Sequence, residues 1–212
     1  MTGVQTCALP ISSLCRALAA SEAGKPESAA TEFETAAIAA APGDPRRDRL
    51  LAAAGNMWIA ANQPGKAALA LDRALSGKGL LADQRGLALL DRARAAEAQG
   101  DLKTARAKLN LAAQSIAEDP FLWYFSAALA IRENDPAAAK LAVGRALSLA
   151  PNDASILFEA GHVAHFAGED AQARDYWSRA IAADPASKSA QAAKQALAML
   201  AAPLTVAPAP KP

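Results

Sequence analysis

The 212-residue sequence is poor in aromatic residues and close to electrically neutral, and each shortage excludes a class of protein. Aromatic residues make up 5% of the chain, and no Val-, Ile- and Thr-rich run alternates with polar residues, so a β-sheet core is not expected. The 22 basic and 21 acidic residues leave a net charge of +1, which provides no attraction for nucleic acid or an anionic membrane. No apolar run reaches the roughly 18 residues that span a bilayer.

Residues suited to metal binding or catalysis are equally scarce. The two cysteines, Cys7 and Cys15, have no zinc-binding spacing. The only histidines, His162 and His165, could share a metal with Glu159, but zinc requires three or four well-placed ligands. A phosphate-binding glycine loop and a nucleophile elbow are also missing. We therefore predict no catalytic residue, no cofactor, no metal site and no enzymatic activity.

What the chain does contain is alanine, arranged for helices. Residues 154–187 have the pattern of two short amphipathic helices joined by a tight turn at Gly168. Gly161 lies where the first helix must allow a close approach by another helix. Asp184-Pro185 ends the second helix, because proline cannot continue a helix interior. One face of that second helix carries two small residues around a bulky one: Ala173, Trp177 and Ala180.

This pattern occurs five times along the chain, with a stride of 34 residues over the last three copies. The small residue of the first helix recurs as Ala17, Gly55, Ala93, Ala127 and Gly161. The small residues of the second helix recur as Ala29, Ala36, Ala67, Ala74, Ala105, Ala112, Ala139, Ala146, Ala173 and Ala180. Four extra residues, about 82–85, precede the third copy. Four residues are about one helical turn, so they lengthen a helix without rotating its apolar face.

The recurring residues resemble the tetratricopeptide repeat, in which small residues, a bulky residue and a closing proline are similarly spaced. The resemblance implies an all-α fold, a right-handed α-α superhelix of about five helix pairs followed by a C-terminal capping helix. We predict a solenoid over residues 12–201. Its repeats are expected at 12–43, 48–81, 86–119, 120–153 and 154–187, and its capping helix at 187–201.

The two ends of the chain do not fit the repeat. Residues 1–11, MTGVQTCALPI, correspond codon for codon to a widely used short-read sequencing adapter, so we predict a non-native leader joined to a fragment of a bacterial gene. The alternative is a disordered native terminus. Residues 202–212 form a proline-rich tail that is expected to be disordered. This prediction places the native start outside the sequence, so a cytoplasmic and a periplasmic location both stay open.

The resemblance also implies where partners bind, namely on the concave surface lined by the first helix of each pair. The residues predicted to line it are Asn56, Arg94, Tyr124, Arg132, Phe158, His162 and Phe166. For each of them the alternative is packing between neighbouring repeats. Asp91 stands where chaperone-tail binders of the family have an asparagine. Because Asp91 would repel a carboxylate, that subclass is excluded.

The predicted function is a scaffold that binds another protein, as a peptide or a partner helix. Two alternatives stay open: a docking or regulatory segment of a truncated enzyme, and a periplasmic envelope-assembly subunit. The upstream gene sequence distinguishes them, because it would contain a catalytic domain in the first case and a signal peptide in the second.

Overall fold

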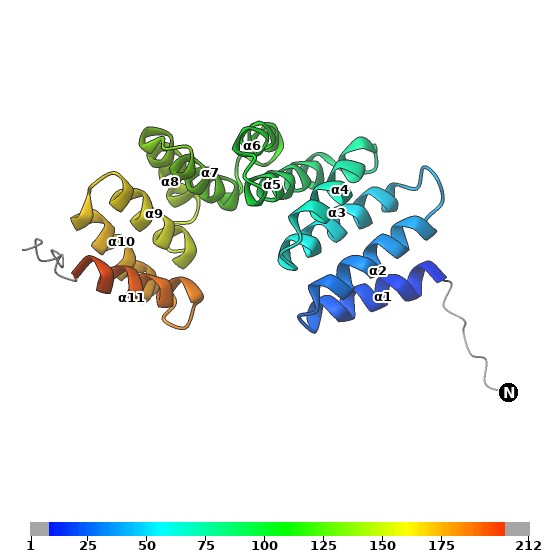
Figure 1. Cartoon of the computed structure of the whole chain (residues 1–212), viewed down its shortest axis with the longest axis horizontal. Helices are drawn as coiled ribbons and strands as arrows, with labels where there is room; N and C mark the ends of the chain where they lie inside the picture. The colour runs from blue at the N-terminus through cyan, green and yellow to red at the C-terminus, as the bar shows by residue number, and fades with distance from the viewer. Residues whose placement is uncertain (1–8, 202–212) are drawn as a thin grey trace, which may run out of the picture. The chain divides into compact units, whose positions relative to one another are not determined.

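The computed structural model describes residues 9–201, a range that contains helices and short connections and no strand. The helices are α1 (Leu9–Glu22), α2 (Pro26–Ala39), α3 (Pro45–Ala60), α4 (Pro64–Ser76), α5 (Ala82–Ala98), α6 (Leu102–Ile116), α7 (Pro120–Arg132), α8 (Pro136–Leu149), α9 (Ala154–Phe166), α10 (Asp170–Ala183) and α11 (Lys188–Ala201) (Figure 1). Residues 1–8 of the predicted leader and the predicted tail, 202–212, lie outside the described residues. None of the described helices combines the length and apolar character that crossing a membrane requires.

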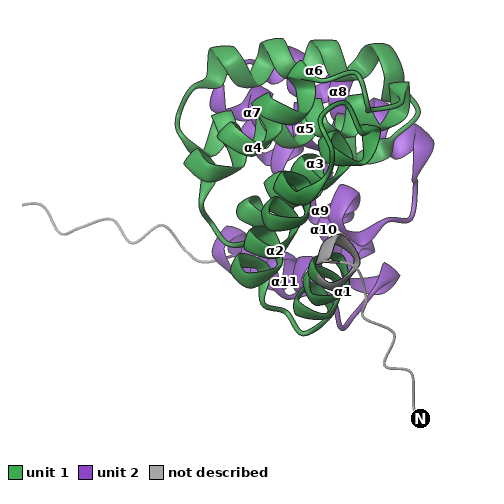
Figure 2. Cartoon of the chain, turned by 90° about the vertical axis from the view of Figure 1, so that its right-hand side faces the viewer, with its two compact units in different colours: residues 1–122 green, residues 123–212 purple. Residues whose placement is uncertain are grey.

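The chain divides into two compact units, residues 1–122 and 123–212 (Figure 2). In the first unit, consecutive helices pack as the pairs α1 with α2, α3 with α4, and α5 with α6. In the second unit, α9 packs against both α8 and α10, and α11 packs against α9 and α10. First helices of successive pairs also touch, as α3 does with α5. The predicted all-α fold of consecutive helix pairs is confirmed.

Each small residue of a first helix is buried and has a large buried residue sixteen positions later. These large residues are Phe33, Leu71, Leu109, Val143 and Trp177. Two of the small positions are glycines. A Cβ atom on Gly55 would lie 2.8 Å from Leu71 Cδ2, and one on Gly161 would lie 2.8 Å from Trp177 Cε2. The close approach predicted at Gly161 is thus confirmed: its missing side chain makes room for the indole of Trp177.

This pairing predicts that Gly161→Ala destabilises the protein, although alanine ordinarily favours a helix by about 1 kcal/mol over glycine. The added methyl group overlaps Trp177, and overpacking costs typically about 1–3 kcal/mol. Combined with Trp177→Leu, Gly161→Ala gives the two positions the residues that Ala93 and Leu109 have in an earlier repeat. In that background Gly161→Ala should instead be neutral or stabilising. Urea denaturation of the four variants measures both effects. The same stabilisation in both backgrounds would contradict the pairing.

Helix starts follow the aspartate signals in the sequence. The backbone N–H of Arg46 donates to Asp44 Oδ1 at 2.8 Å, that of Phe121 donates to Asp119 at 2.8 Å, and that of Ala138 donates to Asp135 at 2.9 Å. Such bonds satisfy N–H groups that have no partner within the helix. In each of these three Asp-Pro sequences, the aspartate thus caps the helix that the proline begins.

The turns inside the pairs share one backbone feature. A residue with positive φ ends the first helix of every pair: Gly24, Asn62, Gly100, Asn134 and Gly168. Glycine and asparagine are the residues that adopt this left-handed conformation most readily. The turn therefore recurs with the repeat, and it brings each second helix back along the first.

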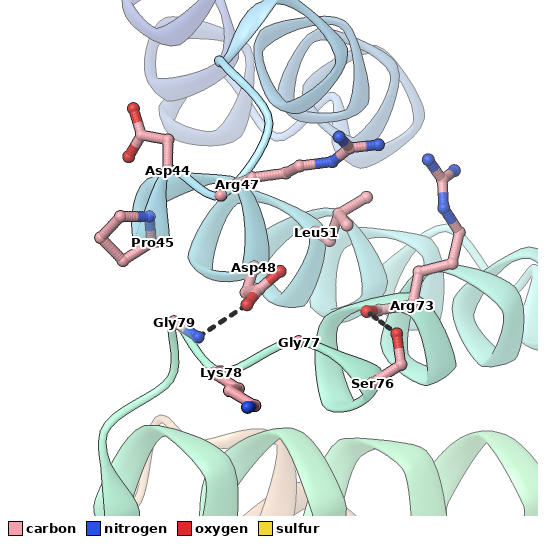
Figure 3. A pocket seen from close by; sticks show the side chains of 11 residues that line it. Asp44, Pro45, Arg47, Asp48, Leu51, Arg73, Ser76, Gly77, Lys78 and Gly79 are labelled. Atoms are coloured by element: carbon pink, nitrogen blue, oxygen red, sulfur yellow. Dashed lines mark hydrogen bonds between the residues drawn. The ribbon is translucent and has the colours of Figure 1, made fainter.

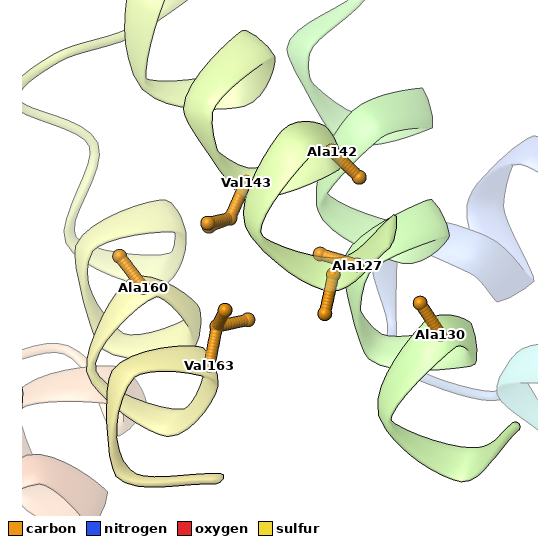
Figure 4. Close-up of a cluster of buried hydrophobic side chains, with 7 residues drawn as sticks. Ala127, Ala130, Ala142, Val143, Ala160 and Val163 are labelled. Carbon is orange, nitrogen blue, oxygen red and sulfur yellow. The ribbon is translucent and has the colours of Figure 1, made fainter. Parts of the chain in front are cut away.

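The core of the second unit is built largely from alanine (Figure 4). One cluster contains Ala127, Ala130, Ala139, Ala142, Val143, Ala160 and Val163. A second cluster surrounds Trp177, and α11 contributes Ala193 to it, with Leu197 and Leu200 packed alongside. The last helix therefore covers an apolar edge that α9 and α10 would otherwise leave open.

Candidate partner-binding site

In the first unit, the predicted partner-binding residues form a polar network on the neighbouring helices α3 and α5. Asn56 Nδ2 donates to Asp91 Oδ2 at 2.8 Å, and Arg94 Nη1 donates to Asp91 Oδ1 at 2.9 Å. Asp91 and Asn56 are half-buried, whereas Arg94 is exposed. Asn56 is therefore engaged within the protein, and Arg94 offers the guanidinium edge that Asp91 leaves free.

In the second unit, Phe158 and His162 of α9 belong to an aromatic group. Their ring centroids lie 4.5 Å apart with the planes at 83°, and the His162 ring also lies 5.7 Å from that of Trp177. Trp177 Nε1 donates to the backbone oxygen of Phe158 at 3.2 Å. These contacts hold both predicted residues against α10.

A cavity of about 550 Å³ opens beside this group, where α9, α10 and α11 meet. Its lining includes His162, His165, Trp177, Met199 and Leu200. Met199 is 76% exposed, so its thioether side chain is accessible to a partner. The cavity therefore combines aromatic walls with an exposed thioether, a combination suited to an apolar side chain of a partner.

The two histidines of this region differ in burial and in their polar contacts. Burial, and then the neighbouring His165, lower the pKa of His162, so His162 is an uncharged ring at neutral pH. His165 Nδ1 lies 2.7 Å from Asp170 Oδ1 at the start of α10. Between residues 9 and 201 no three His, Cys, Asp or Glu side chains are grouped as metal ligands.

The remaining predicted residues lie on α7 and at the end of α9. Tyr124 is half-buried and Arg132 is exposed, both on the part of α7 that belongs to the second unit. Phe166, at the end of α9, is 36% exposed. Of the seven predicted residues, the structure thus brings together Asn56 with Arg94 through Asp91, and Phe158 with His162.

Glu159 is a notable residue that the sequence indicated only as a weak metal-ligand candidate. It is 7% exposed, and burial raises the pKa of Glu159 from 4.5 to about 7. The signal that identifies it is the repeat itself, because Glu159 lies two strides of 34 residues after Asp91. Glu159 and Asp91 therefore occupy the same repeat position on α9 and α5.

The first unit has a cavity of about 700 Å³ beside the turn between α4 and α5 (Figure 3). The backbone N–H of Gly79 donates to Asp48 Oδ2 at 2.7 Å and fastens this turn to α3. Arg47, Arg73 and Lys78 line the cavity together with the Asp48 carboxylate. Because charges of both signs share the wall, the cavity does not select for one sign of ligand.

The helix pairs, their small-residue positions and the covering last helix define a fold of the tetratricopeptide-repeat type. No protein-family model and no curated protein matches the sequence. Solved structures do match. PilW, described as a widely conserved type IV pilus biogenesis factor, is 18% identical and has a TM-score of 0.72, over 86% of this chain and 81% of PilW.

Two further solved structures show the same fold. A tetratricopeptide repeat protein from Parabacteroides merdae is 16% identical with a TM-score of 0.69, over 91% of this chain and 73% of that one. YrrB, described as a tetratricopeptide repeat protein with an unusual peptide-binding site, is 17% identical with a TM-score of 0.60, over 88% of this chain and 92% of YrrB. At these identities the similarity establishes the fold of this chain.

Proposed function

We propose that this chain is a non-catalytic protein-interaction scaffold, and that it binds a peptide or a partner helix on the first helices of its repeats. The observation that carries the proposal is the cavity beside α9, with its aromatic walls and the exposed Met199. Apolar and aromatic side chains that converge on a cavity provide most of the energy in protein interfaces. The description of YrrB supports the proposal, because it associates a peptide-binding site with this fold.

A second candidate is an envelope-assembly subunit in the periplasm. It is favoured by the similarity to PilW, a pilus biogenesis factor. The two candidates share a scaffold role and differ in compartment. Sequencing the gene upstream of Ser12 separates them, because a signal peptide is expected for a periplasmic protein and absent for a cytoplasmic one.

The proposal predicts that Phe166→Ala weakens peptide binding by about tenfold, as expected for an aromatic contact residue. Peptides selected from a displayed random library on the whole chain would be measured by fluorescence anisotropy. Leu141→Ala is the matched control, since Leu141 is 78% exposed on α8, a second helix. Equal losses for both variants, or no selected peptide at all, would count against a binding surface on the first helices.

A further inference from the structure

Glu159 is a buried carboxyl group for which the described chain supplies no hydrogen-bond donor. Among residues 13–201 no hydrogen bond or ion pair reaches it, although it is only 7% exposed. In the described chain, Glu32 Oε2 is the only completely enclosed side-chain polar atom without a hydrogen-bond partner. Because the Glu159 oxygens also lack a partner, they are not completely enclosed. The Glu159 oxygens therefore keep a small solvent-accessible surface.

The position of Glu159 on α9 places it among the predicted partner-binding residues. Ser155, Glu159, His162 and Phe166 follow one another at helical spacings of four, three and four, so they form one stripe of α9. At one end of this α9 stripe, Ser189 Oγ of α11 donates to Ser155 Oγ at 3.1 Å. Further along, His162 lines the cavity beside α11. Glu159 lies between these two points.

Comparison with the equivalent acid in the first unit shows what Glu159 lacks. Asp91 receives hydrogen bonds from Asn56 and from Arg94. In the repeat register, Ala128 takes the place of Asn56, and His162 takes the place of Arg94. Alanine has no donor.

His162 does not replace the missing arginine either. Its ring lies against Phe158 and Trp177. Burial and the neighbouring His165 lower the pKa of His162, so it carries no charge at neutral pH. Both donors that satisfy Asp91 are thus missing around Glu159, while the carboxyl group is kept.

We infer that Glu159 is the acidic anchor of the α9 stripe, and that it pairs with a lysine or arginine side chain of the bound peptide. A carboxylate that is buried without a partner is costly. A cation that pairs with it removes that cost, so binding gains more than an exposed ion pair would provide. The inference rests on the proposed function and adds the chemistry of one partner residue.

A double-mutant cycle tests this inference on the full chain. Peptides selected from a displayed random library on the wild-type protein should share a lysine or arginine at one position. Replacing that residue by norleucine or citrulline should weaken binding to the wild type by roughly 30-fold. The same replacement should have little effect on binding to Glu159→Gln, which should itself bind the parent peptide roughly 30-fold more weakly.

The control is Asp175→Asn, which removes one negative charge from an exposed site on α10. It should leave the affinity within about twofold, as expected for an exposed charge. Thermal melting of Glu159→Gln verifies that the variant is folded. Selected peptides without a shared cation, or an unchanged affinity in Glu159→Gln, would overturn this inference and leave the scaffold function standing. Failure to select any peptide would overturn both.

Discussion

Trp177→Ala is expected to lower the free energy of unfolding by about 3–5 kcal/mol, the usual cost of emptying a large buried aromatic site. Trp177 is 2% exposed, and its cluster includes Leu157, Ala164 and Ala193 from the two adjacent helices. Its indole also donates to the backbone oxygen of Phe158. The other fully buried members of the cluster are mostly alanine, which cannot extend into the space that the mutation leaves.

Urea denaturation followed by far-ultraviolet circular dichroism measures this effect without relying on tryptophan fluorescence. Arg174→Ala, at an exposed position on α10, is the control and should change stability by less than about 0.5 kcal/mol. Because repeat arrays unfold in segments, we expect the loss chiefly in the transition that belongs to residues 123–212. An unchanged unfolding curve would show that the face of α10 carrying Trp177 is not buried.

Glu159→Gln is expected to stabilise the protein at pH 8 and to have almost no effect at pH 4. Burial raises the pKa of Glu159 from 4.5 to about 7, so the folded state favours the protonated acid. That stabilisation is fully present below pH 4.5, where both states are protonated. It is lost as the pH rises through about 7, because the unfolded chain releases the proton more easily.

Glutamine copies the neutral acid and does not titrate. The difference in unfolding free energy between Glu159→Gln and wild type should therefore grow from near zero at pH 4 to about 3 kcal/mol at pH 8. Denaturant titrations at several pH values measure it. Glu169→Gln is the control, since Glu169 is exposed and paired with Lys140, and its effect should stay below about 1 kcal/mol. A difference that does not change with pH would mean that Glu159 ionises normally in the folded protein.

The predicted effects of Glu159→Gln on stability and on peptide binding have opposite signs. The same substitution that should stabilise the free protein above pH 7 should weaken its binding to a cationic peptide. A residue that costs stability and serves binding is common at functional sites. Measuring both properties in Glu159→Gln therefore separates a binding role from a packing fault.

The helix pairs were predictable from the amino-acid sequence, because the residues that specify them act locally. Alanines seven residues apart mark the buried face of each second helix, aspartates such as Asp44 and Asp135 cap helices through neighbouring backbone groups, and glycines such as Gly168 end them. Each signal depends on residues within one or two helical turns. For the same reason the four extra residues at about 82–85 predicted a longer helix, and α5 is the longest described, with 17 residues.

Which side chains on the first helices find hydrogen-bond partners inside the protein depends on contacts between helices, so it could not be predicted from the sequence. Asn56 was predicted to contact a partner, yet it already donates to Asp91 from the neighbouring repeat. Glu159 occupies the same repeat position as Asp91 and receives no such bond. The difference depends on residues far apart in the sequence that meet across helices, such as Asn56 and Asp91, 35 positions apart, and on burial that shifts a pKa. Neither follows from the spacing of residues along one helix.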